Sequence, residues 1–194
     1  MRQMYKITKT MIFTKKHLLI AVCAVLLSLT AVSQPYKKGT TSVSLGGELL
    51  VPERSLNKSH LTGAGTTIKG EYVFGEHSTA TIASGYYFMN GKKTASVHYE
   101  DVSAIPVKGG LRYYLGNFYG SGEAGAIFLS DFNRGIGFVY SVGLGDKIRV
   151  GNNMVDITLR HEAWQIKGIS KGMIALRLGY EFSVSKQQKR DTGF

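Results

Sequence analysis

The chain has 194 residues, enough for one domain, and carries 24 Gly, 11 Tyr, 9 Phe, only 3 Pro and a net charge of +11. This composition argues against collagen-like and mainly helical proteins and predicts a single all-β domain. A surplus of basic residues often indicates nucleic-acid binding. The export signal described next argues against nucleic acid as a partner and favours anionic lipid headgroups.

The N-terminal segment has the pattern of an export signal. The basic cluster Lys15 to His17 precedes an apolar run, Leu18 to Ala31, and a small-x-small cleavage motif follows that ends at Ser33. We therefore expect a signal peptide over residues 1–33. A membrane anchor is the alternative, but the run is shorter than the roughly 20 apolar residues of a spanning helix. The start codon stays open among Met1, Met4 and Met11.

Cleavage near Ser33 would change the chemistry of the chain. Cys23 lies in the apolar run, so the mature protein would have no disulfide, thiol nucleophile or cysteine metal ligand. Five basic and no acidic residues would leave with the signal, which lowers the net charge from +11 to about +6. We expect the mature chain to comprise a barrel domain, residues 34–184, and a polar tail, residues 185–194.

From Thr41 onward, apolar and polar residues alternate with a period of two, in segments separated by Gly, Asn, Asp and Ser. Most segments have about 10 to 14 residues, close to the length that a tilted strand needs to cross a bilayer. The sequence predicts an eight-stranded antiparallel up-and-down transmembrane β-barrel. The expected strands are Thr41 to Val51, Thr66 to Gly75, Thr79 to Asn90, Val102 to Leu115, Phe118 to Ser130, Gly135 to Val150, Met154 to Gln165 and Gly172 to Val184.

The connections between these strands differ in length in an alternating way. Those at 76–78, 116–117 and 151–153 are tight. Those at 52–65 and 91–101 are long and polar, and those at 131–134 and 166–171 are intermediate. Outer-membrane barrels have short periplasmic turns and longer outer loops, so this alternation predicts that both ends of the barrel domain lie in the periplasm.

Alternation gives the strands an apolar face and a charged face. A membrane barrel turns the apolar face outward, whereas a soluble lipocalin-like barrel, the main rival, turns it inward. The apolar face carries Val43, Leu45, Leu49, Ile68, Tyr72, Phe74, Ile105, Val107, Leu111, Tyr113, Phe138, Tyr140, Val142, Leu144, Val155, Ile157, Leu159, Ile174, Leu176, Leu178, Tyr180 and Phe182. The charged face carries Glu48, Lys69, Glu71, Lys108, Arg112, Glu123, Asp156, Arg160, Glu162, Arg177 and Glu181.

The charged residues allow two interpretations of the lumen. They could line a polar conduit, but side chains nearly fill an eight-stranded barrel. Five basic and six acidic residues also suit mutual pairing across a narrow space. We therefore expect a lumen plugged by salt bridges.

Aromatic residues gather near both predicted ends of the barrel, as the amphipathic rings of membrane proteins do. We expect one belt of Tyr72, Phe74, Tyr113, Tyr114, Phe118, Tyr119, Tyr180 and Phe182, and another of Tyr86, Tyr87, Phe88, Phe128 and Trp164. Two belts favour the membrane barrel over the soluble one.

Two stretches resemble the small porin-like outer-membrane β-barrel family that is common in Bacteroidetes. Ala104 to Tyr119 is similar to the central hairpin of that family, and Ile174 to Phe182 is similar to its last strand. The resemblance implies an outer-membrane location, eight strands and recognition of the last strand by the barrel assembly machinery. It does not imply a working pore. The polar tail after Val184 departs from the family pattern.

Chemistry-bearing residues do not form a recognisable enzyme site. Arg160-His161-Glu162 resembles part of the lipid A deacylase barrels, but Ala163 stands where those enzymes have the nucleophilic Ser. The remaining histidines share no ligand spacing, so we expect no metal and no cofactor. We expect a protein that is not an enzyme.

Three functions remain in order of preference. The first is a structural or surface-binding barrel, with an unidentified surface ligand and outer-membrane lipid as partners, because loops commonly carry function. The second is a narrow channel for small solutes, and the third is a lipid-active enzyme. The loop residues expected to bind a ligand are Arg54, Lys58, His60, Lys92, Lys93, His98 and Tyr99.

Overall fold

The computed structural model describes residues 37–94, 97–129, 135–151 and 153–184. The predicted signal peptide, its cleavage site near Ser33 and the polar tail 185–194 lie outside these residues. The described residues belong to one unit, Pro35–Phe194.

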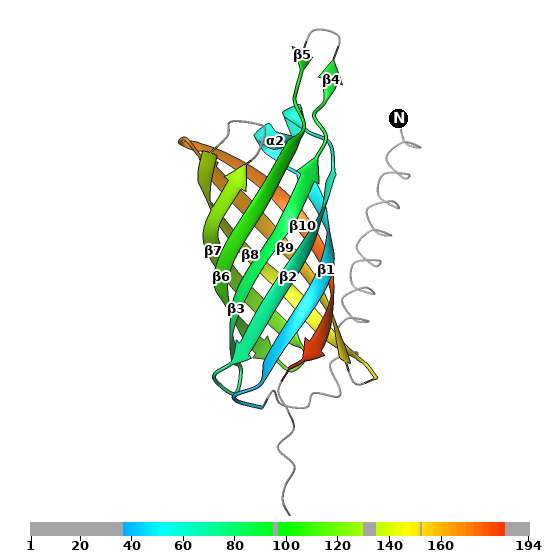
Figure 1. The fold of residues 1–194 in the computed structure, drawn as a ribbon, viewed down its shortest axis with the longest axis vertical. Coiled ribbons are helices and arrows are strands. Elements are labelled where there is room, and N and C mark those ends of the chain that lie inside the picture. The colour runs from blue at the N-terminus through cyan, green and yellow to red at the C-terminus, as the bar shows by residue number, and fades with distance from the viewer. Residues whose placement is uncertain (1–36, 95–96, 130–134, 152, 185–194) are drawn as a thin grey trace, which may run out of the picture. The chain divides into compact units, whose positions relative to one another are not determined.

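Eight long strands form a closed barrel in which every neighbouring pair is antiparallel (Figure 1). The barrel is closed by β1 and β10, which pair from Ser42↔Ser183 to Pro52↔Met173. This architecture confirms the predicted all-β, eight-stranded up-and-down fold. The strands are β1 (Thr41–Pro52), β2 (Gly63–Val73), β3 (Ser78–Met89), β6 (Val102–Leu115), β7 (Phe118–Leu129), β8 (Gly135–Val150), β9 (Asn153–Ile166) and β10 (Ile169–Ser183).

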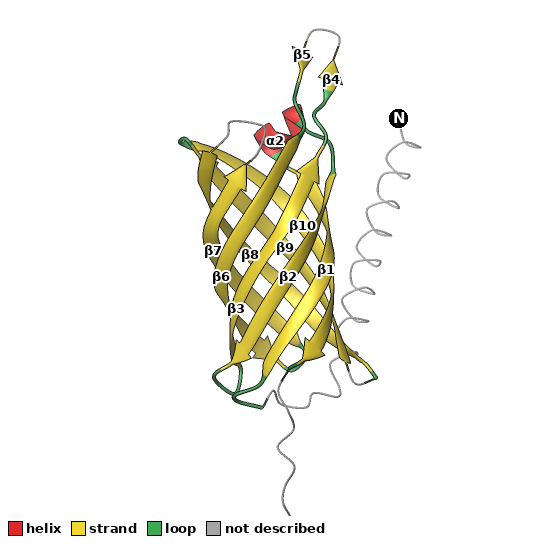
Figure 2. Cartoon of the chain, viewed as in Figure 1, coloured by secondary structure: helices red, strands yellow, loops and turns green. Residues whose placement is uncertain are grey.

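The two long connections contain short elements that the alternation pattern did not predict (Figure 2). The β1–β2 connection contains the helix α2 (Arg54–Ser59). The β3–β6 connection contains a small hairpin of β4 (Lys93–Thr94) and β5 (Val97–His98), which extends beyond the rim of the barrel. No helix among the described residues is long and apolar enough to cross a membrane.

The connection between β9 and β10 is shorter than expected. Instead of an intermediate loop over 166–171, a two-residue turn joins the strands, with positive φ at both Lys167 (49°) and Gly168 (80°). These angles belong to the mirror-image turn that matches the twist of a hairpin. The pattern did not reveal it because Asn-Gly or Asp-Gly is the usual signal for this turn, whereas Lys rarely adopts positive φ.

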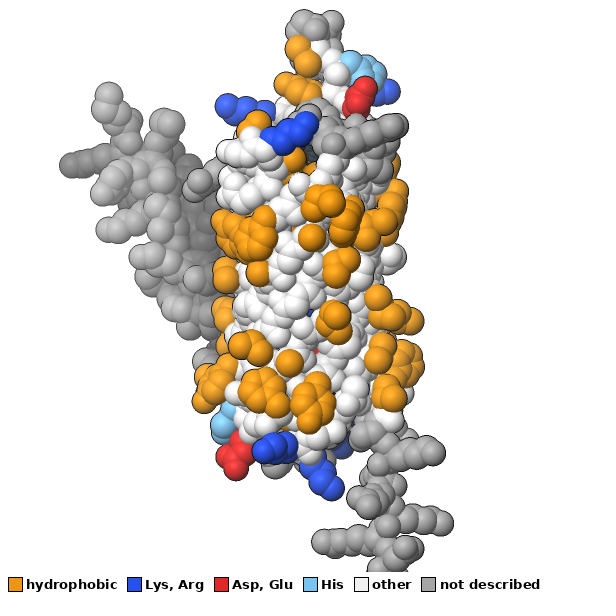
Figure 3. Space-filling view, turned by 60° about the vertical axis from the view of Figure 1, so that its left-hand side comes forward, with side chains coloured by type: hydrophobic (Ala, Val, Ile, Leu, Met, Phe, Trp, Pro, Cys, Tyr) orange, Lys and Arg blue, Asp and Glu red, His pale blue; other side chains and the backbone are white. Residues whose placement is uncertain are grey.

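The apolar face of the strands points outward, so the lipocalin-like alternative is wrong. Every residue of the predicted apolar face is exposed or half-exposed, including Leu111 and Val142 at about 60%. In Figure 3, apolar side chains are spread in groups over the wall of the barrel, and charged side chains gather at its two ends. An outward apolar band between polar ends is what a lipid bilayer requires of a barrel.

Four of the predicted belt aromatics lie inside the barrel instead. Tyr87, Tyr114, Tyr119 and Trp164 are all at most 2% exposed. Neighbouring residues on a strand point to opposite faces, so Tyr113 is outward and Tyr114 is inward even though both are aromatic. The remaining belt residues with outward side chains are Tyr72, Phe74, Tyr113, Phe118, Tyr180 and Phe182 at one end and Tyr86, Phe88 and Phe128 at the other.

Candidate functional site

The lumen contains all eleven residues of the predicted charged face, together with Lys147, which the sequence analysis missed. The six cations and six carboxylates form one connected chain in which the charges alternate. Its order is Lys69, Glu123, Lys108, Glu162, Arg160, Glu48, Arg177, Asp156, Arg112, Glu71, Lys147 and Glu181.

Most links of this ion chain are short and cross the lumen between strands that are not neighbours. Lys69 Nζ of β2 lies 2.6 Å from Glu123 Oε1 of β7. Lys108 Nζ of β6 lies 2.6 Å from Glu162 Oε2 of β9. Arg160 of β9 reaches Glu48 of β1. The ion chain therefore cross-links opposite walls of the barrel.

Arg177 joins the two halves of the ion chain. Its guanidinium lies 3.0 Å from Asp156 Oδ2 and 4.0 Å from Glu48 Oε1, and it donates to Thr67 Oγ1. Space for it comes from Gly179, where an added Cβ would lie 2.2 Å from Arg177 Nη1. The glycine allows a large cation to lie flat against the inner wall.

Buried tyrosines complete the polar network. The Tyr119 ring lies 4.2 Å below the Arg112 guanidinium carbon, a cation–π contact, and its hydroxyl bonds to Asp156. The Tyr114 hydroxyl donates to Glu71. Tyr119 and Tyr114 therefore contact the charged residues of the lumen and do not lie at a membrane interface.

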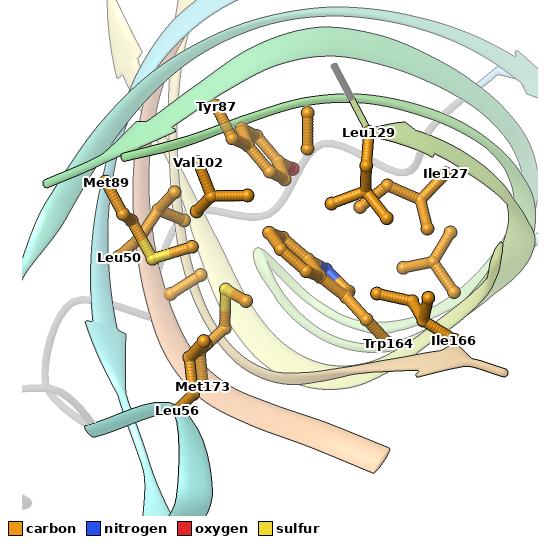
Figure 4. Packing of buried hydrophobic residues seen from close by; sticks show 13 residues of the cluster. Leu50, Leu56, Tyr87, Met89, Val102, Ile127, Leu129, Trp164, Ile166 and Met173 are labelled. Atoms are coloured by element: carbon orange, nitrogen blue, oxygen red, sulfur yellow. The ribbon is translucent and has the colours of Figure 1, made fainter. Parts of the chain in front are cut away.

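The half of the lumen nearer the long loops is filled by apolar side chains, here called the apolar plug (Figure 4). The rings of Tyr87 and Trp164 stack with centroids 6.5 Å apart. Each ring also bonds to the ion chain, because Trp164 Nε1 donates to Glu162 and Arg160 Nη2 donates to the Tyr87 hydroxyl. The plug comprises Leu50, Leu56, Tyr87, Met89, Val102, Ala104, Ile127, Leu129, Val139, Trp164, Ile166, Met173 and Ala175.

The helix α2, here called the lid, contacts β10 and β1 and supplies one side chain to the apolar plug. Leu56, its one plug residue, is 1% exposed. The lid is tied to the neighbouring connection by a β-bridge between His60 and Gly91, and Lys92 Nζ donates to the Asn57 carbonyl. The plug and its lid are therefore built partly from the loops.

Buried side chains of the ion chain and the apolar plug occupy the lumen over the described residues. The interior void lined by Lys69, Tyr87 and Arg160 has no volume that a water molecule could occupy. Chemically, the arrangement can brace the barrel from inside.

The predicted loop-binding residues divide into exposed and structural ones. Lys58, Lys93 and His98 are exposed, Lys92 and Tyr99 are half-buried, and Arg54 begins α2. His60 is different, because it is fully buried. Burial and the nearby Lys171 lower the pKa of His60. His60 is therefore a neutral part of the lid and not a surface ligand.

The histidine considered for catalysis has no triad around it. His161 faces outward with Nε2 3.2 Å from Glu53 Oε2. Glu162 points into the lumen, where it is fully buried, and Ala163 supplies no nucleophile. Among the described residues, no group of three His, Cys, Asp or Glu side chains is placed to hold a metal ion.

No protein-family model matches the chain, and no curated protein matches it in sequence. Solved structures match in fold. Ail, the attachment invasion locus protein of Yersinia pestis, aligns with a TM-score of 0.54 and 18% identity, covering 75% of this chain and 100% of that chain. The structure of the same outer membrane protein in a phospholipid nanodisc gives a TM-score of 0.51 and 17% identity over the same shares.

A third similar structure is the outer membrane protein OprG of Pseudomonas aeruginosa, with a TM-score of 0.48 and 11% identity over 78% of this chain and 99% of that chain. At these identities the similarity to Ail shows the fold of a small outer-membrane barrel. The Bacteroidetes-type resemblance stays a prediction.

Proposed function

We propose that this protein is an exported, non-conducting barrel of the outer membrane that binds an acidic surface polymer with its long-loop end. The closed lumen carries the proposal. The ion chain, the apolar plug and the α2 lid fill the interior, so the parts available to a partner are the ordered connections at the rim.

The charge of this end supports an acidic partner. Among the described residues of the long connections and of the β9–β10 hairpin end, basic side chains outnumber carboxylates. The basic residues with described side chains are Lys58, Lys92, Lys93, Lys167 and Lys171, and the carboxylates are Glu53, Glu100 and Asp101. One carboxylate, Glu53, has Oε2 3.2 Å from His161 Nε2. A surplus of cations on exposed loops attracts polyanions.

The location is tested by fractionating cells that express the protein, followed by electrophoresis with and without boiling. We expect an outer-membrane fraction and an unboiled band that migrates differently from the boiled one. Release into the periplasm or medium would contradict the membrane part of the proposal.

The closed lumen is tested by conductance in planar bilayers. We expect no channel events from the intact barrel, because the plug and the ion chain fill the lumen with buried side chains. A steady conductance that changes in Arg112→Ala would favour the narrow channel and overturn the proposal.

Binding is tested with immobilised dextran sulfate, with unsulfated dextran as the neutral reference. We expect retention on the sulfated polymer only, and its loss in the double variant Lys58→Glu/Lys93→Glu, which changes two exposed side chains. The matched control is Lys37→Glu/Lys38→Glu, two exposed lysines at the opposite end of the barrel. Equal losses in both variants would show a general charge effect and no site.

A further inference from the structure

A groove of about 890 Å³ is hollowed into the outer wall of the barrel, away from the lumen and the loops. It extends over β1, β2, β3, β9 and β10, and outward side chains such as Leu45, Ile68 and Leu178 line it. Tyr86, late in β3, and Tyr180, late in β10, lie toward opposite ends of the barrel. The groove therefore extends along the apolar band between the two aromatic belts.

An outward glycine, Gly47, opens the floor of the hollow. Gly46 of β1 is paired with Gly179 of β10, and the adjacent Gly47 faces outward opposite Thr66 of β2. A Cβ added at Gly47 would meet no atom within 4 Å, so the floor of the groove is bare backbone with open space above it. The inward glycines, by contrast, are required by the Arg177 guanidinium.

Besides Tyr86 and Tyr180 toward its two ends, the groove is lined by two short hydroxyl side chains on the outer face, Ser84 and Thr66. Ser84 lies at the middle of β3, and Thr66 lies on the neighbouring strand β2. The register pairs Thr66 with Tyr86 and Ile68 with Ser84, which makes the two hydroxyl residues diagonal neighbours on one face. An apolar hollow with a few convergent polar groups is the usual form of a small-molecule site.

The same part of the wall has an interrupted ladder. The pairing of β3 with β6 passes from Ser84↔Val107 to Tyr87↔Ala104 without pairs at Gly85 and Tyr86. Pro106 stands opposite Gly85 and has no N–H to donate. A ligand that brings a hydroxyl group to the groove would meet the hydroxyls of Ser84 and Thr66 there.

We propose that this groove binds the acyl chain of a membrane lipid and prefers a chain with a hydroxyl group near its middle. The occupant follows from the surroundings, because the groove belongs to the outward apolar band that lipid covers. The hydroxyl preference follows from Ser84 and Thr66. This site is independent of the loop surface described above.

The probes for the test are stearic acid and a hydroxystearic acid with its hydroxyl near the middle of the chain. Each is titrated into the protein in perdeuterated detergent micelles while the backbone amide signals are followed by NMR. We expect saturable shifts at Gly47, Ser84 and Gly85. The hydroxylated probe should bind about fivefold more tightly, the size of one hydrogen bond.

Three variants make the test specific. Gly47→Leu fills the groove without a clash and should abolish the saturable shifts. Gly122→Leu adds the same side chain to another outward glycine with open space, on β7, and should leave them intact. Ser84→Ala should remove most of the preference for the hydroxylated probe. An unboiled band on electrophoresis verifies that each variant folds.

Two outcomes would overturn the proposal. If shifts occur over the whole outer wall without saturation, or persist in Gly47→Leu, the groove is ordinary lipid-facing surface. If both probes bind equally and Ser84→Ala changes nothing, the hydroxyl preference is wrong.

Discussion

The two halves of the lumen are equally buried but are held together in different ways. The half nearer the long loops contains the apolar plug, in which Leu50, Met89 and Ile127 are fully buried. The other half contains the ion chain, in which most charges contact two opposite charges. Apolar contacts are non-directional, whereas a buried ion needs each of its partners.

The plug and the ion chain also depend on each other. Ion pairs are strong only where water is excluded, because water screens charge. The plug and its lid close the lumen toward the loops, and Trp164 and Tyr87 present apolar rings to the plug and polar atoms to the ions. We infer that the apolar half seals the ionic half, which braces the walls.

The largest expected effect comes from removing a cation inside the ion chain. Arg112→Met leaves Glu71 without its 2.6 Å partner and Asp156 with Arg177 alone in the chain. Breaking a buried pair typically costs about 3 to 5 kcal/mol. We expect a loss of that size in the free energy of unfolding, measured in lipid vesicles from the fraction of the unboiled band across a urea series.

The matched control is Lys69→Met at the end of the ion chain. Its single partner, Glu123, keeps Lys108 at 3.3 Å. We expect a loss of about 1 to 2 kcal/mol, the cost of one charged hydrogen bond. Equal losses in the two variants would show that position in the chain does not matter.

A cavity in the apolar plug should cost somewhat less than the broken ion chain. Leu50→Ala removes a fully buried side chain, and such changes cost about 2 to 4 kcal/mol. Because no charge is involved, the loss should be the same at low and high salt in the same urea series. A salt-dependent loss would mean that the plug and the ion chain cannot be treated as separate layers.

The hydrogen bonds that join the apolar plug to the ion chain should contribute less to the free energy of unfolding. Trp164→Phe keeps an aromatic ring in the plug but removes the N–H that donates to Glu162 Oε1 at 2.9 Å. Glu162 keeps Lys108 and Arg160, so we expect a loss of about 1 to 2 kcal/mol. The comparison variant is Tyr87→Phe, which removes the other polar atom of the stacked pair. No loss in either variant would contradict the coupling of plug and ion chain.

The strands and the two faces could be predicted from sequence because alternation has a strict period of two. Once Leu111 is assigned outward, its neighbour Arg112 must point inward, and the same alternation places Glu48 and Arg177 inside. Continued to the end of β8, the alternation also places Lys147 inside. The alternation in β8 was therefore sufficient to predict that Lys147 lies in the lumen.

What the sequence did not reveal depends on contacts between distant segments. The aromatic belts were assigned by residue type and not by phase, which misplaced Tyr119 and Trp164. The α2 lid has too few residues for a helical pattern, and it is held by contacts such as the bond from Lys92 to Asn57. His60 was expected at the surface because nothing local shows that it is covered.

The smallest expected change in global stability comes from the lid, whose effect should be local. Leu56→Ala removes the plug residue that α2 supplies, and the short helix can settle into the space. We expect a loss of about 1 kcal/mol, below the usual range for this change because the site can collapse. Trp164 is the only Trp of the chain, so its fluorescence reports on the plug alone.

We expect acrylamide to quench Trp164 more strongly in Leu56→Ala than in the unmodified protein, because the lid opens more often and admits water and small solutes to the plug. Leu61→Ala, in the same connection but 50% exposed, should leave quenching unchanged. If the lid seals the lumen, quenching and salt sensitivity of unfolding should rise together in Leu56→Ala. Unchanged quenching would mean that the strands alone keep acrylamide away from Trp164. The lid would then contribute only to the loop surface.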